Sequence, residues 1–128
     1  MADTQKITAS VRESAIMCAD SKGNQVAVGG EGPRATDLLL MAVAGCSGSV
    51  LKAVLGKEGF VPTKVEMTIE GVRADAPRRF ESINAHYYVE CPGLTEEKLR
   101  ECLEKTELAC PVIQSLSAKV NVTFTLAK

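Results

Sequence analysis

The stretch TDLLLMAVAGCSGSVLKAVL, residues 36–55, decides the fold class. Asp37 stands where a carboxylate favours the positive end of a helix, and Thr36 is a suitable N-cap. Two glycines just beyond Leu55 supply a stop signal, so the pattern predicts a helix that runs to about Leu55. Because Leu38–Ala44 is apolar on nearly every side, we expect a buried central helix rather than a surface one.

Short extended segments flank this helix. Before it, the alternating and β-prone runs predict a strand meander with a turn at residues 20–24, built from residues 6–12, 15–19 and 25–28. After it, strict alternation of apolar and polar residues predicts two longer strands, over residues 64–70 and 83–90. The polar stretch 73–79 is expected to join these two strands.

The C-terminal third predicts two helices and a closing strand. Thr95 opens an amphipathic helix whose apolar face comprises Leu99, Cys102, Leu103 and Thr106. Pro111 breaks that helix and suits the first position of a short third one, and residues 120–126 alternate as a strand. The order of elements predicts an α+β fold with mainly antiparallel sheets around the central helix, in a single domain over residues 1–128.

Composition excludes several classes of function. The chain has 15 basic and 16 acidic residues and a net charge of −1, which gives no reason to expect a nucleic acid or a membrane as partner. The uncharged run from Leu38 to Leu51 is too short to cross a bilayer, and the polar N-terminus lacks a leader pattern. We therefore expect a cytoplasmic protein whose five cysteines are reduced thiols. His86 and Cys91 lack further ligands at zinc spacing, so no metal is expected.

Two cysteines are candidates for chemistry. Cys46 lies within the long helix among small residues that leave room for a substrate, although composition alone favours a buried packing role. Cys110 precedes Pro111, which places its thiol at a helix N-terminus, where unpaired N–H groups favour the thiolate. A buried kink residue is the alternative for Cys110. The residues alone leave both questions open.

Two segments resemble the motifs of OsmC/Ohr proteins. Residues 32–46, GPRATDLLLMAVAGC, are similar to the Gly-Pro loop, acidic residue and Leu/Ala-rich helix that carry the reactive cysteine in that family. Residues 110–116, CPVIQSL, resemble its second motif, a Cys-Pro step before a short helix. The order of elements agrees from about Lys6 onwards. Residues 74–80, ADAPRRF, suggest a less characterised branch of the superfamily.

This resemblance implies an enzyme that reduces organic or lipid hydroperoxides in oxidative-stress defence. Cys46 would attack the peroxide and become a sulfenic acid, and Cys110 would resolve it as a disulfide that a dithiol then reduces. The resemblance also implies an intertwined homodimer and neither a metal nor an organic cofactor. A small-molecule binding or redox-sensing protein of the same fold, with little turnover, is the alternative function.

Further charged residues are expected at the site. A thiolate in an apolar helix needs a positive neighbour, for which Arg12 and Arg78 are candidates, with Arg34 behind them. Arg12 is only a loose match to the arginine turn of hydroperoxide-specialised members. Asp37 lies nine residues before Cys46, on the opposite face of the helix and about 13 Å away along its axis. Asp37 is therefore expected either to orient an arginine at a partner subunit's site or merely to cap its own helix.

Overall fold

The computed structural model describes residues 4–127. These residues form two compact units, of which the first ends at Leu39 and the second begins at Leu40. The first unit contains the three short strands, and the second contains the three long strands together with most of the helical residues. The assignment of the whole chain to a single domain stays a prediction.

The first unit contains a three-stranded antiparallel sheet in the order β1-β2-β3, as the sequence predicts. Its strands are β1 (Thr8–Val11), β2 (Ile16–Ala19) and β3 (Gln25–Val28). The Asp20 carboxylate accepts backbone N–H groups from Lys22 and Asn24 and so closes the expected turn. None of residues 4–39 is fully buried, so this small sheet has no closed core of its own.

Helix α1 (Ala35–Lys57) ends where the glycine signal predicts, with the Phe60 N–H donating to the Leu55 carbonyl at 2.9 Å. It begins one residue before Thr36, which therefore lies in the first turn and is not the N-cap. Its 23 residues are long and apolar enough to cross a membrane, a criterion that core helices of soluble proteins also meet. The uncharged run Leu38–Leu51 is one part of this helix, which extends beyond the run at both ends.

The burial of α1 is less complete than the sequence predicts. Its fully buried residues form one stripe at i, i+4 spacing: Val43, Ser47, Leu51 and Leu55. Other sides stay open, and Met41 is 56% exposed. Helix α1 is central in the order of elements. Within one chain, however, other side chains bury only the face of α1 that carries this stripe.

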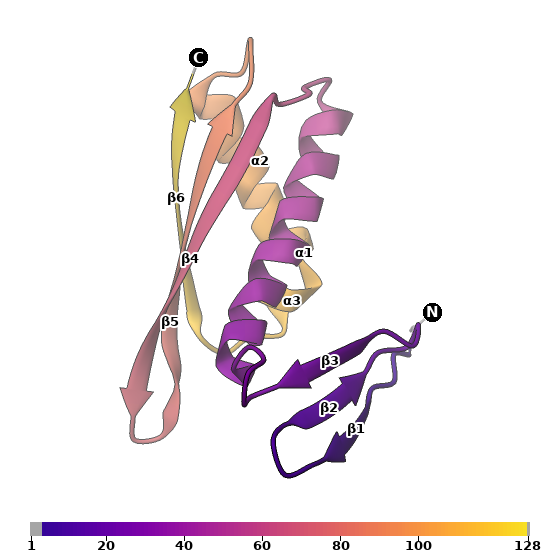
Figure 1. Cartoon of the computed structure of the whole chain (residues 1–128). Coiled ribbons are helices and arrows are strands. Elements are labelled where there is room, and N and C mark those ends of the chain that lie inside the picture. The colour runs from indigo at the N-terminus through magenta and orange to yellow at the C-terminus, as the bar shows by residue number, and fades with distance from the viewer. Residues whose placement is uncertain (1–3, 128) are drawn as a thin grey trace. The chain divides into compact units, whose positions relative to one another are not determined.

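The second unit contains a sheet in the order β4-β5-β6 (Figure 1). Its strands are β4 (Lys64–Asp75), β5 (Arg78–Glu90) and β6 (Lys119–Ala127). β4 and β5 are antiparallel, whereas β6 runs parallel to β5. The predicted connection over residues 73–79 is wrong, because cross-strand pairing continues to Asp75 and Arg78. Its polar composition reflects the exposed tip of a hairpin rather than a loop.

A β-bulge changes which side chains of β5 face the helices. The register shifts between Val72 and Arg73, so that Val72 pairs with Ser82 but Arg73 pairs with Phe80. Glu81 is the extra residue on β5. Since side chains alternate along a strand, this extra residue moves Phe80 to the face that carries Ile83, and it places Arg78 on that same face.

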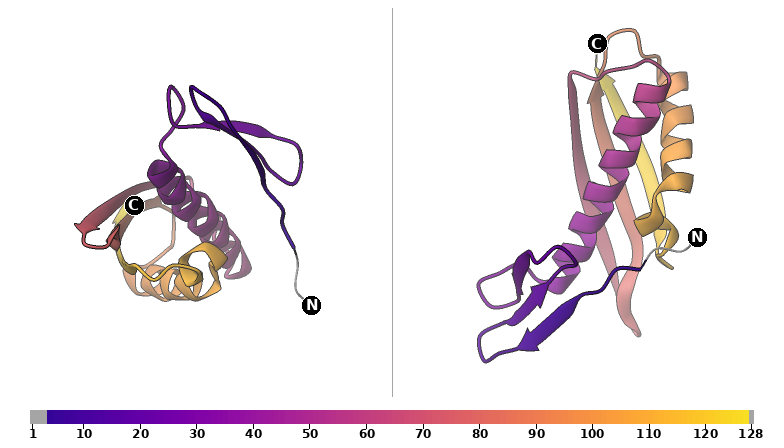
Figure 2. Two further views of the ribbon diagram at one scale, coloured as in Figure 1. Left: turned by 90° about the horizontal axis from the view of Figure 1, so that it is seen from below. Right: turned by 90° about the vertical axis from the view of Figure 1, so that its right-hand side faces the viewer.

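Helices α2 (Glu96–Ala109) and α3 (Pro111–Gln114) follow the sequence prediction closely. Thr95 caps α2, its hydroxyl accepting the Lys98 N–H at 3.1 Å. The buried face of α2 is the predicted one: Leu99, Cys102, Leu103 and Thr106. Helices α1 and α2 lie on the same side of the second sheet (Figures 1 and 2), where residues of both helices and of β5 share one core cluster.

Candidate functional site

Cys46 and Cys110, which lie 64 positions apart in the sequence, come together in the second unit. Both belong to one apolar cluster, in which buried Val43, Ile83, Cys110 and Ile113 are surrounded by half-buried residues that include Cys46. The thiol of Cys46 lies close enough to the Cys110 thiol to influence the pKa of Cys110. The structure therefore brings the two candidate cysteines within reach of each other.

The two thiols differ in access. Cys110 is 0% exposed, whereas Cys46 on the flank of the buried stripe of α1 is half-buried. Cys110 has extended backbone between α2 and α3, because Pro111 cannot continue α2. The Gln114 side chain donates to the Glu107 carbonyl at 2.9 Å and ties the short α3 to the end of α2. An incoming reactant thus meets Cys46 first, with Cys110 behind it.

Burial raises the pKa of the Cys110 thiol. The backbone N–H groups of Ile113 and Val112 point at the sulfur and lower that pKa, as the helix N-terminus argument predicts, but desolvation is the larger effect. Of the two alternatives that the sequence leaves open for Cys110, the burial favours the kink residue with a buried side chain. A nearby Cys46 thiolate raises the pKa of Cys110 further, since two like charges in an apolar cluster repel each other.

A buried pair of hydroxyl groups adjoins Cys46, and the sequence prediction missed it. Ser47 is fully buried and donates its hydroxyl to the Val43 carbonyl at 2.6 Å. Its oxygen neighbours the phenol of Tyr87, which is 1% exposed. Burial raises the pKa of Tyr87, and the nearby Ser47 hydroxyl opposes that rise. The available signal was a serine within an apolar helix and a tyrosine at an inward position of an alternating strand.

The predicted charged residues each have local surroundings of their own. Arg78 begins β5 and is exposed, but it lies on the face of Phe80, whose ring packs against the cysteine cluster. Asp37 forms an ion pair with Arg34 at 3.2 Å at the start of α1, and both side chains are partly exposed. Arg12 lies in the turn after β1, where its N–H donates to the Ala15 carbonyl. The roles of Arg12, Asp37 and Arg78 stay predictions.

The two glycines near Cys46 occupy different environments. A Cβ atom at Gly45 would meet nothing within 4 Å, so this residue lies on the open side of α1. A Cβ atom at Gly48 would lie 3.4 Å from the Met67 sulfur of β4. Gly48 therefore allows α1 to approach its own sheet.

The remaining cysteines lie apart from this pair. Burial raises the pKa of both Cys91 and Cys102, which belong to the larger core cluster, and Cys18 lies on β2. Within residues 4–127, no three His, Cys, Asp or Glu side chains gather as metal ligands would. His86 lies between the hydroxyls of Thr123 and Thr125, at 2.6 and 2.9 Å. It is a residue of the sheet surface.

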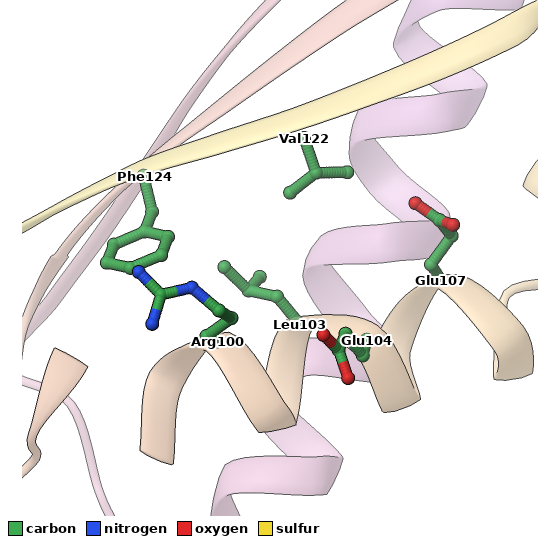
Figure 3. Close-up of a pocket in the computed structure, with 6 residues that line it drawn as sticks. All are labelled: Arg100, Leu103, Glu104, Glu107, Val122 and Phe124. Carbon is green, nitrogen blue, oxygen red and sulfur yellow. The ribbon is translucent and has the colours of Figure 1, made fainter. Parts of the chain in front are cut away.

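Two grooves border α2. The first, of about 210 Å³, lies between α2 and β6 and contains the Arg100 guanidinium over the Phe124 ring, 5.3 Å from its centre, together with Glu104 and Glu107 (Figure 3). Its six lining residues include no nucleophile. The second, of about 280 Å³, lies between α1 and the end of α2 and is lined by Ser49, Val50, Ala53, Val54, Lys57 and Ala109. Only this second groove reaches the residue beside Cys110.

Comparisons with known proteins agree with this architecture. Residues 28–125 match the family described as OsmC-like protein. Protein YhfA of Escherichia coli is 30% identical over 110 residues, which cover 80% of this chain and 81% of YhfA. Peroxiredoxin OsmC of Escherichia coli is 28% identical over 100 residues, 77% of this chain and 70% of that protein. The crystal structure of an OsmC-like protein from Mycoplasma pneumoniae covers the whole of both chains with a TM-score of 0.90 at 22% identity.

Proposed function

The chain belongs to the OsmC-like protein family, and from that premise we propose that it is a cysteine-based thiol peroxidase for organic, lipid-type hydroperoxides. The observation that carries this proposal is the meeting of Cys46 and Cys110 in one apolar cluster, with Cys46 the more accessible thiol. A relative named peroxiredoxin supports the reaction class, and the apolar surroundings of Cys46 favour an organic substrate over hydrogen peroxide.

The reaction assigns one step to each thiol. The Cys46 thiolate attacks the outer peroxide oxygen, the O–O bond breaks, and the alkoxide leaves and takes up a proton to become an alcohol. Cys46 is thereby oxidised to a sulfenic acid. The Cys110 thiolate then attacks the Cys46 sulfur, a disulfide forms, and hydroxide leaves and is protonated to water. A dithiol reductant restores both cysteines and is itself oxidised to a disulfide.

Arg78 is the activating residue that the second unit offers. It lies two positions before Phe80 on the same face of β5, and Phe80 packs against the cluster of the two cysteines. A guanidinium that swings toward Cys46 when substrate binds would favour the thiolate. Arg12 keeps the same proposed role from the first unit. Alanine variants of each, assayed for Cys46 alkylation against pH, separate the two candidates.

We also propose a homodimer. The open side of α1 carries Met41, which is 56% exposed, and residues 4–39 include none that is fully buried. A second copy would cover both surfaces and remove apolar area from water. The Arg34–Asp37 ion pair would then lie at the rim of the partner's site. Sedimentation at micromolar concentration tests this directly, since a stable monomer contradicts it. A cytoplasmic location, where thiol reductants are available, completes the proposal.

A binding or redox-sensing protein is the second candidate, and one observation favours it. Arg78 is exposed and forms no ion pair within the described part of the second unit, so the thiol lacks a fixed cation on that side. Slow turnover with reversible disulfide formation would result from such an arrangement.

One experiment separates the two candidates. The reduced protein receives one equivalent of cumene hydroperoxide or hydrogen peroxide, and intact mass and free thiols are followed over time. The peroxidase predicts rapid loss of two thiols with the organic peroxide, loss of only one in Cys110→Ser, and none in Cys46→Ser. Equal, slow oxidation by both peroxides selects the sensor. Retention of the disulfide reaction in Cys46→Ser would refute both assignments.

A further inference from the structure

Strand β6 is an open edge of the second sheet. The order β4-β5-β6 ends at β6, and no further strand pairs with it among residues 4–127. Its nine residues pair with β5 without a register shift, and Lys119 at the start is its only charged residue. Charges, prolines and bulges are the usual means by which proteins protect an edge strand from pairing. The other edge, β4, has charges along its length and the shift between Val72 and Arg73, whereas β6 is able to accept another strand.

The groove between α2 and β6 lies along this open edge (Figure 3). Its lining residues come from α2 and β6 and none from β5, so the groove opens on the outer flank of β6. Val122 and Phe124, which form the β6 wall, are only half-buried. A volume of about 210 Å³ suits one or two side chains rather than a larger ligand. Since side chains alternate along a strand, every second residue of a strand added to β6 would face this groove.

Two carboxylates of the groove have no cation beside them. Glu104 and Glu107 lie one turn apart on α2, and within the described part of the chain neither forms an ion pair. The two lysines of α2, Lys98 and Lys105, both pair instead with Glu58 of α1. The lysines are therefore held on the α1 side of the helix and leave the groove side acidic.

Arg100 does not neutralise these carboxylates. It precedes Glu104 by four residues, a spacing at which opposite charges on a helix often pair. The two side chains nevertheless form no ion pair in the described residues, and the Arg100 guanidinium lies over the Phe124 ring, 5.3 Å from its centre (Figure 3). The groove thus has the Arg100–Phe124 stack at one end and an acidic end at Glu107, about 10 Å away along α2.

We propose that β6 and this groove bind an extended peptide segment of another protein, which adds to the sheet beyond β6 and places a lysine or arginine beside Glu104 and Glu107. Backbone hydrogen bonds to β6 would provide affinity, and the two carboxylates would select a basic side chain. An apolar side chain two residues away, about 7 Å along the added strand, would lie against Leu103 and Val122. This surface is separate from the two thiols, and the proposal does not depend on the peroxidase reaction.

A second copy of the chain is a less suitable occupant of this edge. Two chains paired through β6 would bring two acidic grooves to the same junction, and like charges across an interface disfavour such a pairing. The simplest alternative is that Glu104 and Glu107 are solvated carboxylates beside a surface hollow. That alternative predicts no peptide binding, and pairing through β6 predicts a β6 edge that changes with protein concentration.

The test uses the isotope-labelled full-length protein and follows its backbone amide shifts by NMR. The probe is the capped peptide STVTKTVTS, whose valines and central lysine share one face, and the comparison peptide is STVTETVTS. The lysine peptide should shift amides of β6 and α2 and bind about threefold to tenfold more tightly than the glutamate peptide. Glu104→Gln/Glu107→Gln should abolish this preference. The matched control is Glu97→Gln, an α2 glutamate outside the groove, which should keep it.

Backbone methylation of the peptide separates strand addition from charge attraction alone. N-methyl groups on alternate residues should abolish binding when they are on the residues that hydrogen-bond to β6, and should preserve it on the intervening residues. Equal binding of the two methylated peptides, equal affinity for lysine and glutamate, or no shift in β6 at millimolar peptide would each overturn the proposal. Shifts of β6 amides that depend on protein concentration without peptide would also overturn it, because a second copy would then occupy the edge.

Discussion

Removal of the Ser47 hydroxyl tests the buried polar pair beside Cys46. In Ser47→Ala the Val43 carbonyl keeps its helical N–H partner, but the Tyr87 phenol loses its neighbour in a site where Tyr87 is 1% exposed. A buried donor left without a partner costs about 1–3 kcal/mol of unfolding free energy. For a chain of 128 residues, each kcal/mol corresponds to about 4 °C in Tm.

The decisive measurement is the double-mutant cycle. Tyr87→Phe removes the phenol and should cost about 0.5–1.5 kcal/mol, the usual net value of one hydrogen bond. The double variant Ser47→Ala/Tyr87→Phe leaves no stranded hydroxyl, so its cost should fall below the sum of the single costs by at least about 0.5 kcal/mol. Urea unfolding at one fixed protein concentration provides the three values.

An exposed serine on the same helix provides the control. Ser49→Ala should change stability by less than about 0.5 kcal/mol, since Ser49 has no buried partner. If the loss of unfolding free energy in the double variant equals the sum of the two single losses to within about 0.3 kcal/mol, Ser47 and Tyr87 do not interact. The same result would remove the polar pair from the description of the site.

Three further predictions concern the thiol, a helix cap and an ion cluster. Because burial raises the pKa of Cys110, the rate of disulfide formation after a stoichiometric pulse of cumene hydroperoxide should rise about tenfold per pH unit between about pH 7 and 8.5. Rapid quenching followed by thiol counting measures this rate. A rate that does not change with pH would contradict the raised pKa of Cys110. Thr95→Ala should lower unfolding free energy by about 1 kcal/mol through loss of the α2 cap, whereas Thr95→Ser should not, as thermal melts will report. Lys98 and Lys105 lower the pKa of Glu58. Wild type should therefore be more stable than Glu58→Gln at neutral pH, and this difference should disappear as the pH falls through the lowered pKa or when about 1 M salt is added. A stability difference that persists in acid would exclude the ion cluster as its source.

The sequence was most informative where a local rule has one structural outcome. Thr95 before two glutamates and Pro111 after Cys110 mark helix boundaries, and the structure places α2 and α3 accordingly. The apolar face of α2 was equally predictable from its spacing. These signals depend on neighbours within one or two turns, so no tertiary information was needed.

The errors arose where distant residues decide the outcome. The stretch 73–79 has the polar composition of a loop, yet the pairing of β4 with β5 holds its residues Arg73 and Arg79 in strands. The helix N-terminus at Cys110 predicted a favoured thiolate, but burial by residues from α1 and β5 outweighs it. Ser47 and Tyr87 lie on different elements, and no sequence motif predicts that the two side chains are neighbours. Charge contacts of Arg12, Asp37 and Arg78 with the thiols would likewise depend on tertiary or subunit arrangement.

The parallel pairing of β5 with β6 has a consequence for the order in which the chain acquires its structure. β4 and β5 are neighbours in sequence and can pair outward from the short turn between them. β6 can pair with β5 only after the whole α2–α3 segment has crossed over the sheet. Cys110 lies within that crossover, so it meets Cys46 only when this late, non-local closure is complete. Nascent or partly folded chains would hold the two thiols apart, and a Cys46–Cys110 disulfide would serve as a chemical record that folding had finished.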